Sequence, residues 1–219
     1  MFPLRDVIPS PTVPVLTVTI IVLNSVAWIY ELTLSERDLA RLLQQFGVVP
    51  AFFSWPTIVS SMFLHGSWTH VIGNMWFLWI FGDNVEDRMG RLRFVIFYLL
   101  CGTAAALGQV WIDPGSTLPT IGASGAIAGV MGAYLVLYPH SRVLTLIPLI
   151  IFVEIIEIPA IFLLGFWFLL QLVSAGAIAV TTHSQEGGIA FMAHVAGFLM
   201  GLVGVFVFRR RQPSSAPWM

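Results

Sequence analysis

Runs of about twenty apolar residues recur along most of the chain, and this pattern restricts the possible folds more than any other feature. Hydrophobic residues make up 58% of the 219 residues and charged residues only 10%, whereas a soluble domain carries about 25% charged residues. Because a transmembrane helix needs about 20 predominantly apolar residues, most of the surface is expected to face lipid. The sequence therefore predicts an all-α polytopic membrane protein.

Six of these runs are predicted as transmembrane helices of a single membrane domain. Turn-forming sequences, such as DPGSTLP at 113–119 and YPHSR at 138–142, separate consecutive runs. The apolar stretch 143–180 contains two prolines and two glutamates near its middle, and we interpret it as an apolar interfacial loop followed by one span. The predicted spans are residues 13–30, 60–82, 93–112, 123–138, 158–179 and 189–208.

The placement of the ten arginines, in a chain without lysine, supports this number of spans. Positive charges in short loops concentrate on the cytoplasmic side of a membrane. With six spans, only Arg37 and Arg41 lie outside, so both termini and the tail 209–219 are expected in the cytoplasm. A cleavable signal peptide over residues 1–30 is the alternative, but it would leave five spans and spoil this distribution. The inner arginines are Arg5, Arg88, Arg91, Arg93, Arg142, Arg209, Arg210 and Arg211.

Four polar side chains from three predicted spans are expected at similar depth near the outer face. Ser124 begins the fourth span, and His194 lies about five residues into the sixth, roughly 8 Å along a helix. His70 and Asn74 are one helical turn apart on the second span. Polar groups within a membrane usually face the bundle interior and mark functional sites. The sequence therefore predicts a site at this depth, although Ser124 alone could be a small packing residue.

Small residues at four-residue spacing predict which helices meet. Gly125 and Gly129 lie on the fourth span, and Gly197 and Gly201 lie on the sixth. Such residues let helix backbones approach closely in lipid. Contact between these two spans would bring the Ser124 hydroxyl within hydrogen-bond reach of an imidazole, as a base-activated nucleophile requires. No acidic residue is expected at this depth, so the simplest proposal is a Ser–His dyad whose histidine is oriented by packing.

At these positions the chain resembles the rhomboid family of intramembrane serine proteases. The resemblance rests on four motifs in order along the second to sixth spans. These are HGSWTHVIGN (65–74), EDRMG (86–90), GASG (122–125) and AHVAGFLMG (193–201).

The resemblance implies that Ser124 is the nucleophile and His194 the general base. It implies that His70 and Asn74 form an oxyanion hole with the backbone N–H of Ser124, and that residues 31–56 form an outer loop partly embedded in the membrane. The expected activity is cleavage of transmembrane segments of other proteins near the outer face, without a cofactor, a metal or nucleic acid. The six-span form without an extra domain suggests a bacterial inner (plasma) membrane, with an organelle as the alternative location. The residues expected to support the site are His65, Gly122, Gly125, Gly197 and Gly201, with the Glu86/Arg88 pair.

The chain departs from the family pattern at two points, and two other functions remain as alternatives. Many relatives carry an aromatic residue one turn after the serine, packed on the histidine ring, where this chain has Ala128. Either another ring supports His194 or its orientation is looser. The first loop also lacks a Trp-Arg pair that some bacterial members have. The alternatives are a catalytically silent rhomboid-like protein that binds clients, and a small transporter or channel suggested by Glu154 and Glu157.

Overall fold

The structure, a computed structural model, describes residues 2–148, 153–180 and 190–210. Most of these residues are helical, and three short strands form one small sheet. A single turn of 3-10 helix (Pro50–Phe52) lies between the second and third α-helices. The α-helices of the described residues are α1 (Val15–Glu31), α2 (Glu36–Phe46), α3 (Trp55–Ser61), α4 (Trp68–Met89), α5 (Arg91–Ile112), α6 (Ser124–Leu137), α7 (Ala160–Val180) and α8 (Phe191–Phe208).

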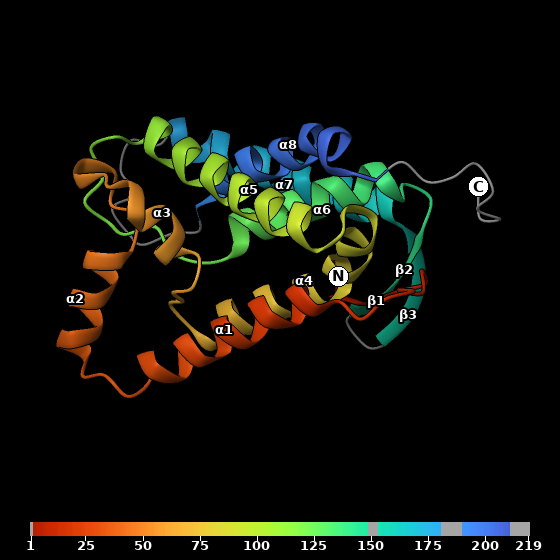
Figure 1. The fold of residues 1–219 in the computed structure, drawn as a ribbon. Helices are drawn as coiled ribbons and strands as arrows, with labels where there is room; N and C mark the ends of the chain where they lie inside the picture. Colours follow the sequence, from red (N-terminus) through yellow and green to blue (C-terminus); the bar gives the residue numbers. More distant parts are fainter. Residues whose placement is uncertain (1, 149–152, 181–189, 211–219) are drawn as a thin grey trace.

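Helix α6 lies in the middle of the molecule, in contact with α4, α5, α7 and α8 (Figure 1). All of its residues from Gly125 to Tyr134 are buried. Its sequence is rich in glycine and alanine, so neighbouring helices can approach it from several sides. Helices α2 and α3 lie at one end of the molecule and the strands at the other (Figure 1). We call these the Ser124 end, where α6 begins, and the sheet end.

The exterior of the helices carries many large apolar side chains. Among the helices of the described residues, α5 and α8 are long and apolar enough to cross a membrane, judged by length and composition. Helices α1 and α6 and the segment Ala160–Gly176 are shorter apolar helices. Exposed apolar residues include Val22, Val26 and Ile29 on α1, Phe162, Leu169 and Val173 on α7, and Val203 and Val207 on α8.

Five of the six predicted spans begin and end within two residues of a helix, namely α1, α5, α6, α7 and α8. The predicted span 60–82 differs, because α3 ends at Ser61 and α4 begins only at Trp68. Ser67 caps α4 by accepting a hydrogen bond from the backbone N–H of His70 at 3.2 Å. At its other end α4 continues to Met89 and stops before Gly90, whose φ of +76° favours glycine. Apolarity alone placed both ends of this helix too early, the start by eight residues (60 against 68) and the end by seven (82 against 89).

The prediction of an all-α fold is wrong between α6 and α7, where residues 143–157 were expected to form an interfacial loop and the structure describes residues 142–148 and 153–159. They form β2 (Arg142–Pro148) and β3 (Val153–Pro159), and β1 (Phe2–Asp6) pairs with the other edge of β2, so that all three strands are antiparallel. Val143 and Thr145 are buried and Leu144 between them is less so, which is the two-residue period of a strand. Hydropathy does not distinguish a short apolar strand from a loop or a helix segment.

Candidate active site

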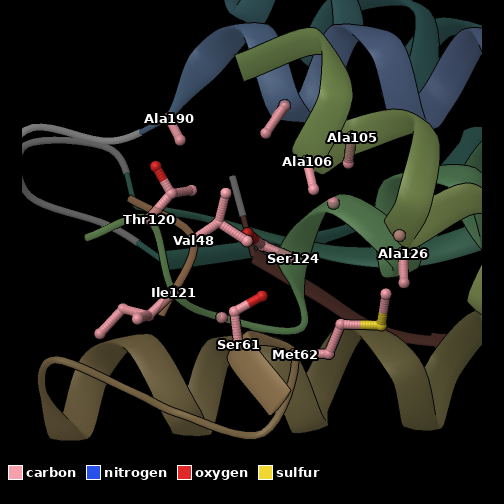
Figure 2. A pocket seen from close by; sticks show the side chains of 14 residues that line it. Val48, Ser61, Met62, Ala105, Ala106, Thr120, Ile121, Ser124, Ala126 and Ala190 are labelled. Carbon is pink, nitrogen blue, oxygen red and sulfur yellow. The ribbon is translucent and has the colours of Figure 1, made fainter. Parts of the chain in front are cut away.

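Ser124 is the first residue of α6, and its side chain borders a small cavity. The cavity has a volume of about 30 Å³, and Figure 2 shows Ser124 among side chains from several separate segments of the chain. Ser124 itself is half-buried. The backbone N–H groups of the first helical turn have no partner within the helix, so this turn offers donors beside the hydroxyl. The lining side chains are mostly small or apolar and include Val48, Met62, Ala105, Ala106, Ile121, Ala126, Ala190 and Ala193.

The loop before Ser124 is held by backbone hydrogen bonds to two other segments. Thr120 and Val48 exchange two N–H···O bonds, of 2.8 and 3.0 Å, and the N–H of Gly122 donates to the carbonyl of Ser61 at 2.8 Å. Gly122 has a φ of +116°, a conformation that L side chains rarely adopt. The nucleophile candidate therefore follows a fixed, glycine-dependent turn.

The structure brings Ser124 and His194 together. His194 lies in the first turn of α8, and its Nε2 is 2.8 Å from the Ser124 Oγ, which is hydrogen-bond distance. The two residues are 70 positions apart in the sequence. A hydroxyl beside an imidazole nitrogen is the arrangement in which the nitrogen can take the hydroxyl proton.

Two side chains of α7 hold the His194 ring, and sequence reasoning identified neither. The Nδ1 of His194 is 2.7 Å from the Oε1 of Gln171. The Trp167 ring lies beside the imidazole, with centroids 5.8 Å apart and an interplanar angle of 35°. Trp167 therefore takes the place of the aromatic residue that is absent at Ala128, and the expectation that packing alone orients His194 is wrong. The available signal was a glutamine one turn after a tryptophan in an otherwise apolar span.

His70 and Asn74 point from α4 toward the turn before Ser124. A Cβ atom added at Gly122 would lie 2.5 Å from the His70 Nε2 and 3.6 Å from the Asn74 Nδ2. The N–H of Gly66 approaches the His70 Nδ1 at 3.5 Å, so that nitrogen is the acceptor and Nε2 is left as a donor. Both side chains thus present N–H groups near the nucleophile.

His65 and Glu31 form a buried support behind these donors. The Asn74 Nδ2 is 3.0 Å from the His65 Nε2, and the backbone N–H of His65 approaches both carboxylate oxygens of Glu31 at 3.3 Å. His65 and His70 meet edge to face, with ring centroids 5.0 Å apart. Glu31 ends α1, so this carboxylate ties α1 to the loop that precedes α4.

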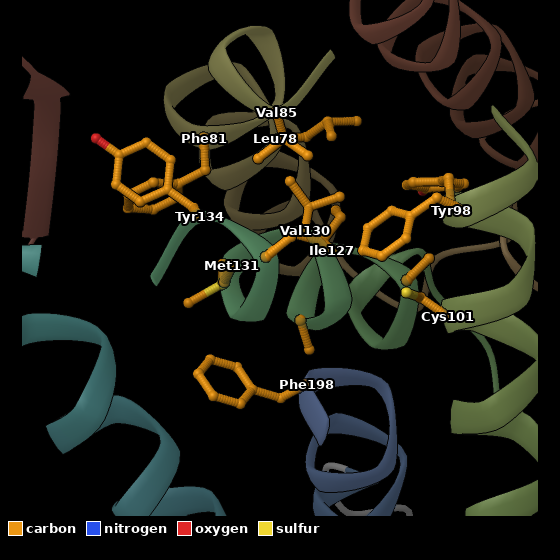
Figure 3. Packing of buried hydrophobic residues seen from close by; sticks show 14 of the residues in the cluster. Leu78, Phe81, Val85, Tyr98, Cys101, Ile127, Val130, Met131, Tyr134 and Phe198 are labelled. Atoms are coloured by element: carbon orange, nitrogen blue, oxygen red, sulfur yellow. The ribbon is translucent and has the colours of Figure 1, made fainter. Parts of the chain in front are cut away.

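The four glycines expected at the helix contact lie at the interface of α6 and α8. A Cβ added at Gly197 would lie 2.0 Å from the carbonyl oxygen of Gly125, and one added at Gly201 would lie 2.0 Å from that of Gly129. The backbones therefore touch, and no larger residue fits without separating the helices. Figure 3 shows larger side chains packed around α6, including Leu78 and Phe81 of α4, Tyr98 of α5 and Phe198 of α8, together with Ile127, Val130 and Met131 of α6 itself.

Comparison with known proteins identifies the family. A model of the Rhomboid domain matches residues 53–211, which contain Ser124, His194 and all four motifs. The chain belongs to the rhomboid family. Rhomboid proteins are membrane-embedded, which explains why α1, α7 and α8 carry apolar side chains on their exterior. The family includes serine proteases.

Relatives from a fungus, an animal and a bacterium show how far the likeness extends. Rhomboid protein 1, mitochondrial, of Saccharomyces cerevisiae is 30% identical over 151 residues, which cover 67% of this chain and 40% of the relative. The Presenilin-associated rhomboid-like protein, mitochondrial, of Homo sapiens is 28% identical over 170 residues, 72% of this chain and 40% of the relative. The Bacillus subtilis protein named "Putative rhomboid protease YdcA" is 31% identical over 81 residues, 37% of this chain and 40% of the relative. The chain thus spans about two fifths of the length of these relatives.

Proposed function

We propose that this rhomboid protein is an intramembrane serine endopeptidase that uses a Ser124–His194 dyad. The observation that carries the proposal is the 2.8 Å contact between the Ser124 Oγ and the His194 Nε2. A packing serine would need no such partner, and a protein that only binds clients would need neither side chain. Membership of a family that includes serine proteases supports the same conclusion.

In the proposed reaction, the Ser124 Oγ attacks a peptide carbonyl carbon while the His194 Nε2 takes the hydroxyl proton. The carbonyl oxygen becomes an oxyanion, which accepts hydrogen bonds from His70, Asn74 and the backbone N–H of Ser124. Removing one such donor typically costs about 10²–10³ in rate. Collapse of this intermediate breaks the C–N bond, and His194 returns the proton to the leaving amine. Water then hydrolyses the acyl-enzyme with His194 again as the base.

The proposed substrates are transmembrane segments of other proteins, cleaved near the outer face of the membrane. Peptide bonds inside a helix are hydrogen-bonded and shielded, so segments that unwind readily should be preferred. The cavity beside Ser124 holds about 30 Å³ and is bordered by alanines, which favours small side chains next to the cleaved bond. No cofactor, metal or nucleic acid enters this proposal.

The proposed membrane arrangement has six spans, formed by α1 and α4 to α8, with both termini in the cytoplasm of a bacterial cell. Residues 31–56, which include α2, would form the outer loop that partly enters the membrane. Single cysteines at Arg5 and Arg37, in a Cys101→Ser background, would test this topology. An impermeant thiol reagent should label the cysteine at Arg37 in intact cells and the one at Arg5 only after permeabilisation. The reverse pattern would contradict it.

The decisive experiment is cleavage of a single-span reporter in liposomes by the wild type, Ser124→Ala and His194→Ala. Ser25→Ala and His140→Ala are matched controls, because the Ser25 hydroxyl donates to the carbonyl of Ile21 within its own helix and His140 is exposed. Cleavage by the wild type and both controls, but by neither site variant, supports the proposal. Equal behaviour of all five folded proteins would contradict it and favour a client-binding function.

A further inference from the structure

Gln171 contacts the proposed catalytic pair from a helix that carries none of the family motifs. It is the one carboxamide in the sequence of α7. Its Oε1 lies 2.7 Å from the His194 Nδ1, on the side of the ring away from Ser124. A polar side chain in an apolar membrane helix is costly and usually serves a site.

We infer that Gln171 is a positioning residue that holds His194 in the tautomer able to take the proton of Ser124. This inference rests on the proposed function. The carbonyl oxygen of an amide can only accept a hydrogen bond, so the Nδ1 carries the hydrogen that is donated to Gln171. In a neutral imidazole the other nitrogen then has the free lone pair. That nitrogen is Nε2, which faces the Ser124 hydroxyl at 2.8 Å.

Trp167 restricts the same ring in a second direction. Residues four apart lie on one face of a helix, so Trp167 and Gln171 approach His194 together. The tryptophan ring lies beside the imidazole, tilted 35° to it with centroids 5.8 Å apart, while the hydrogen bond to the amide restricts rotation of the imidazole. Trp167 also packs against Phe198, with ring centroids 6.0 Å apart. Phe198 lies one turn after His194 on α8. The base is therefore held by α7 from two sides, without a carboxylate.

A neutral third member gives this site a particular chemical character. When Nε2 takes the Ser124 proton, the imidazolium still donates its Nδ1–H to the Gln171 oxygen. The amide orients the ring in both protonation states but adds no negative charge beside it. A carboxylate in the same place would accept the same hydrogen bond, whereas a thioether of similar length would accept almost none.

The test compares Gln171→Met and Gln171→Glu with the wild type, in the full chain and in liposomes. Gln109→Met on α5 is the matched control, because Gln109 is not a hydrogen-bond partner of His194. We expect Gln171→Met to lower kcat about 10–100-fold with KM nearly unchanged, since a misplaced catalytic group can cost about 100-fold. Gln171→Glu should keep most of the wild-type kcat, although a half-buried carboxylate lowers its Tm. Gln171→Glu would then be the less stable but the more active of the two variants. A merely structural role predicts instead that the less stable variant is also the less active one.

The tautomer can also be read without catalysis, from ¹⁵N chemical shifts of selectively labelled histidine with His194→Ala as the assignment reference. The wild type should carry its proton on Nδ1, and Gln171→Met should show a mixture of both tautomers. A wild-type proton on Nε2, or a Gln171→Met variant with wild-type kcat, overturns the inference. A wild type that cleaves nothing and does not react with a fluorophosphonate, yet is protonated on Nδ1, contradicts the proposed function and leaves the tautomer assignment supported.

Discussion

Gly122 sets the backbone turn that places Ser124 beside the two proposed oxyanion donors. Its φ is +116°, and an added Cβ would lie 2.5 Å from the His70 Nε2. Gly122→Ala should therefore displace His70 and lower kcat by about 10²-fold or more, the usual effect of losing an oxyanion donor. Gly115→Ala is the control, because its Cβ would meet nothing within 4 Å. Equal kcat values for the two variants would remove His70 from the proposed oxyanion hole.

Single residues of the site could be predicted where a helical period and a common depth constrain them. His70 and Asn74 are one turn apart, and Ser124 and His194 each lie near the start of a helix. Helix geometry therefore predicted that these four side chains lie at a similar depth. Gln171 and Trp167 could not be found in this way. Helix α7 is apolar apart from Gln171 and Ser174, and its sequence does not indicate that the face carrying Gln171 meets α8. Only the packed structure places that face against the imidazole.

The contact between α6 and α8 depends on glycine at the level of whole helices. A Cβ at Gly201 would lie 2.0 Å from the carbonyl oxygen of Gly129, and a helix backbone cannot yield as a flexible side chain does. Gly201→Ala should separate the helices and lower the free energy of unfolding by about 1–3 kcal/mol, as overpacking does. Gly165→Ala on α7, where a Cβ meets nothing within 4 Å, should be neutral or stabilising by up to about 1 kcal/mol. Thermal unfolding in detergent measures both.

The N-terminus of α1 is capped by a carboxylate from another helix. Pro14 provides no side-chain cap, and Glu86 of α4 accepts hydrogen bonds from the N–H groups of Leu16 and Thr17 at 3.0 and 2.8 Å. Hydrogen bonds to charged groups contribute about 1.5–3 kcal/mol each. Glu86→Ala removes both of these bonds and should therefore lower the free energy of unfolding by at least about 3 kcal/mol.

The matched control for this cap is Glu36→Ala, which removes an exposed first-turn acid from α2. Its stability should change by less than about 0.5 kcal/mol, as for most surface substitutions. Equal losses of unfolding free energy in the two variants would show that Glu86 stabilises the fold only through its charge and not through these hydrogen bonds. The sequence could only mark Glu86 as structural support, because its partners lie 69 and 70 residues away.

The sheet shows why the remaining elements were not predictable. Strand β2 pairs with β1 near the other end of the described chain as well as with its neighbour β3. Helices depend on local periodicity, and the five predicted ranges that match a helix follow it. A strand is stabilised by pairing with another strand, which can lie far away in the sequence and cannot be identified from local residues. The apolar stretch after α6 therefore predicted the start of α7 to within two residues but neither β2 nor β3.

Helix α6 joins the two ends of the molecule, since Ser124 begins it and Tyr134 lies in its last turns. At the sheet end, the Tyr134 hydroxyl donates to the Asp6 carboxylate at 2.7 Å, and the Asn84 amide donates to the same oxygen at 2.9 Å. Asp6 thus fastens the sheet to α4 and α6. Any change at Asp6 should act on the stability of the whole bundle rather than on the geometry of Ser124.

This fastening makes stability depend on pH in a definite direction. Burial raises the pKa of Asp6 above its ordinary value of 3.8, although the hydrogen bond from Tyr134 acts in the opposite sense. A raised pKa in the folded state favours the protonated acid there, so its stabilising effect is complete below pH 3.8 and is lost as the pH rises through the folded pKa.

Asp6→Asn should therefore flatten the fall in stability from acid to neutral pH, because an amide stays neutral and still offers an oxygen to Tyr134 and Asn84. Asp38→Asn removes an exposed carboxylate, 55% accessible, and should leave the slope unchanged. Unfolding free energies of the three proteins from pH 3 to pH 7, measured with the same denaturant, give the comparison. Identical slopes for Asp6→Asn and the wild type would mean that Asp6 titrates alike in the folded and unfolded chains. The sheet would then be held to α4 and α6 by packing rather than by this carboxyl group.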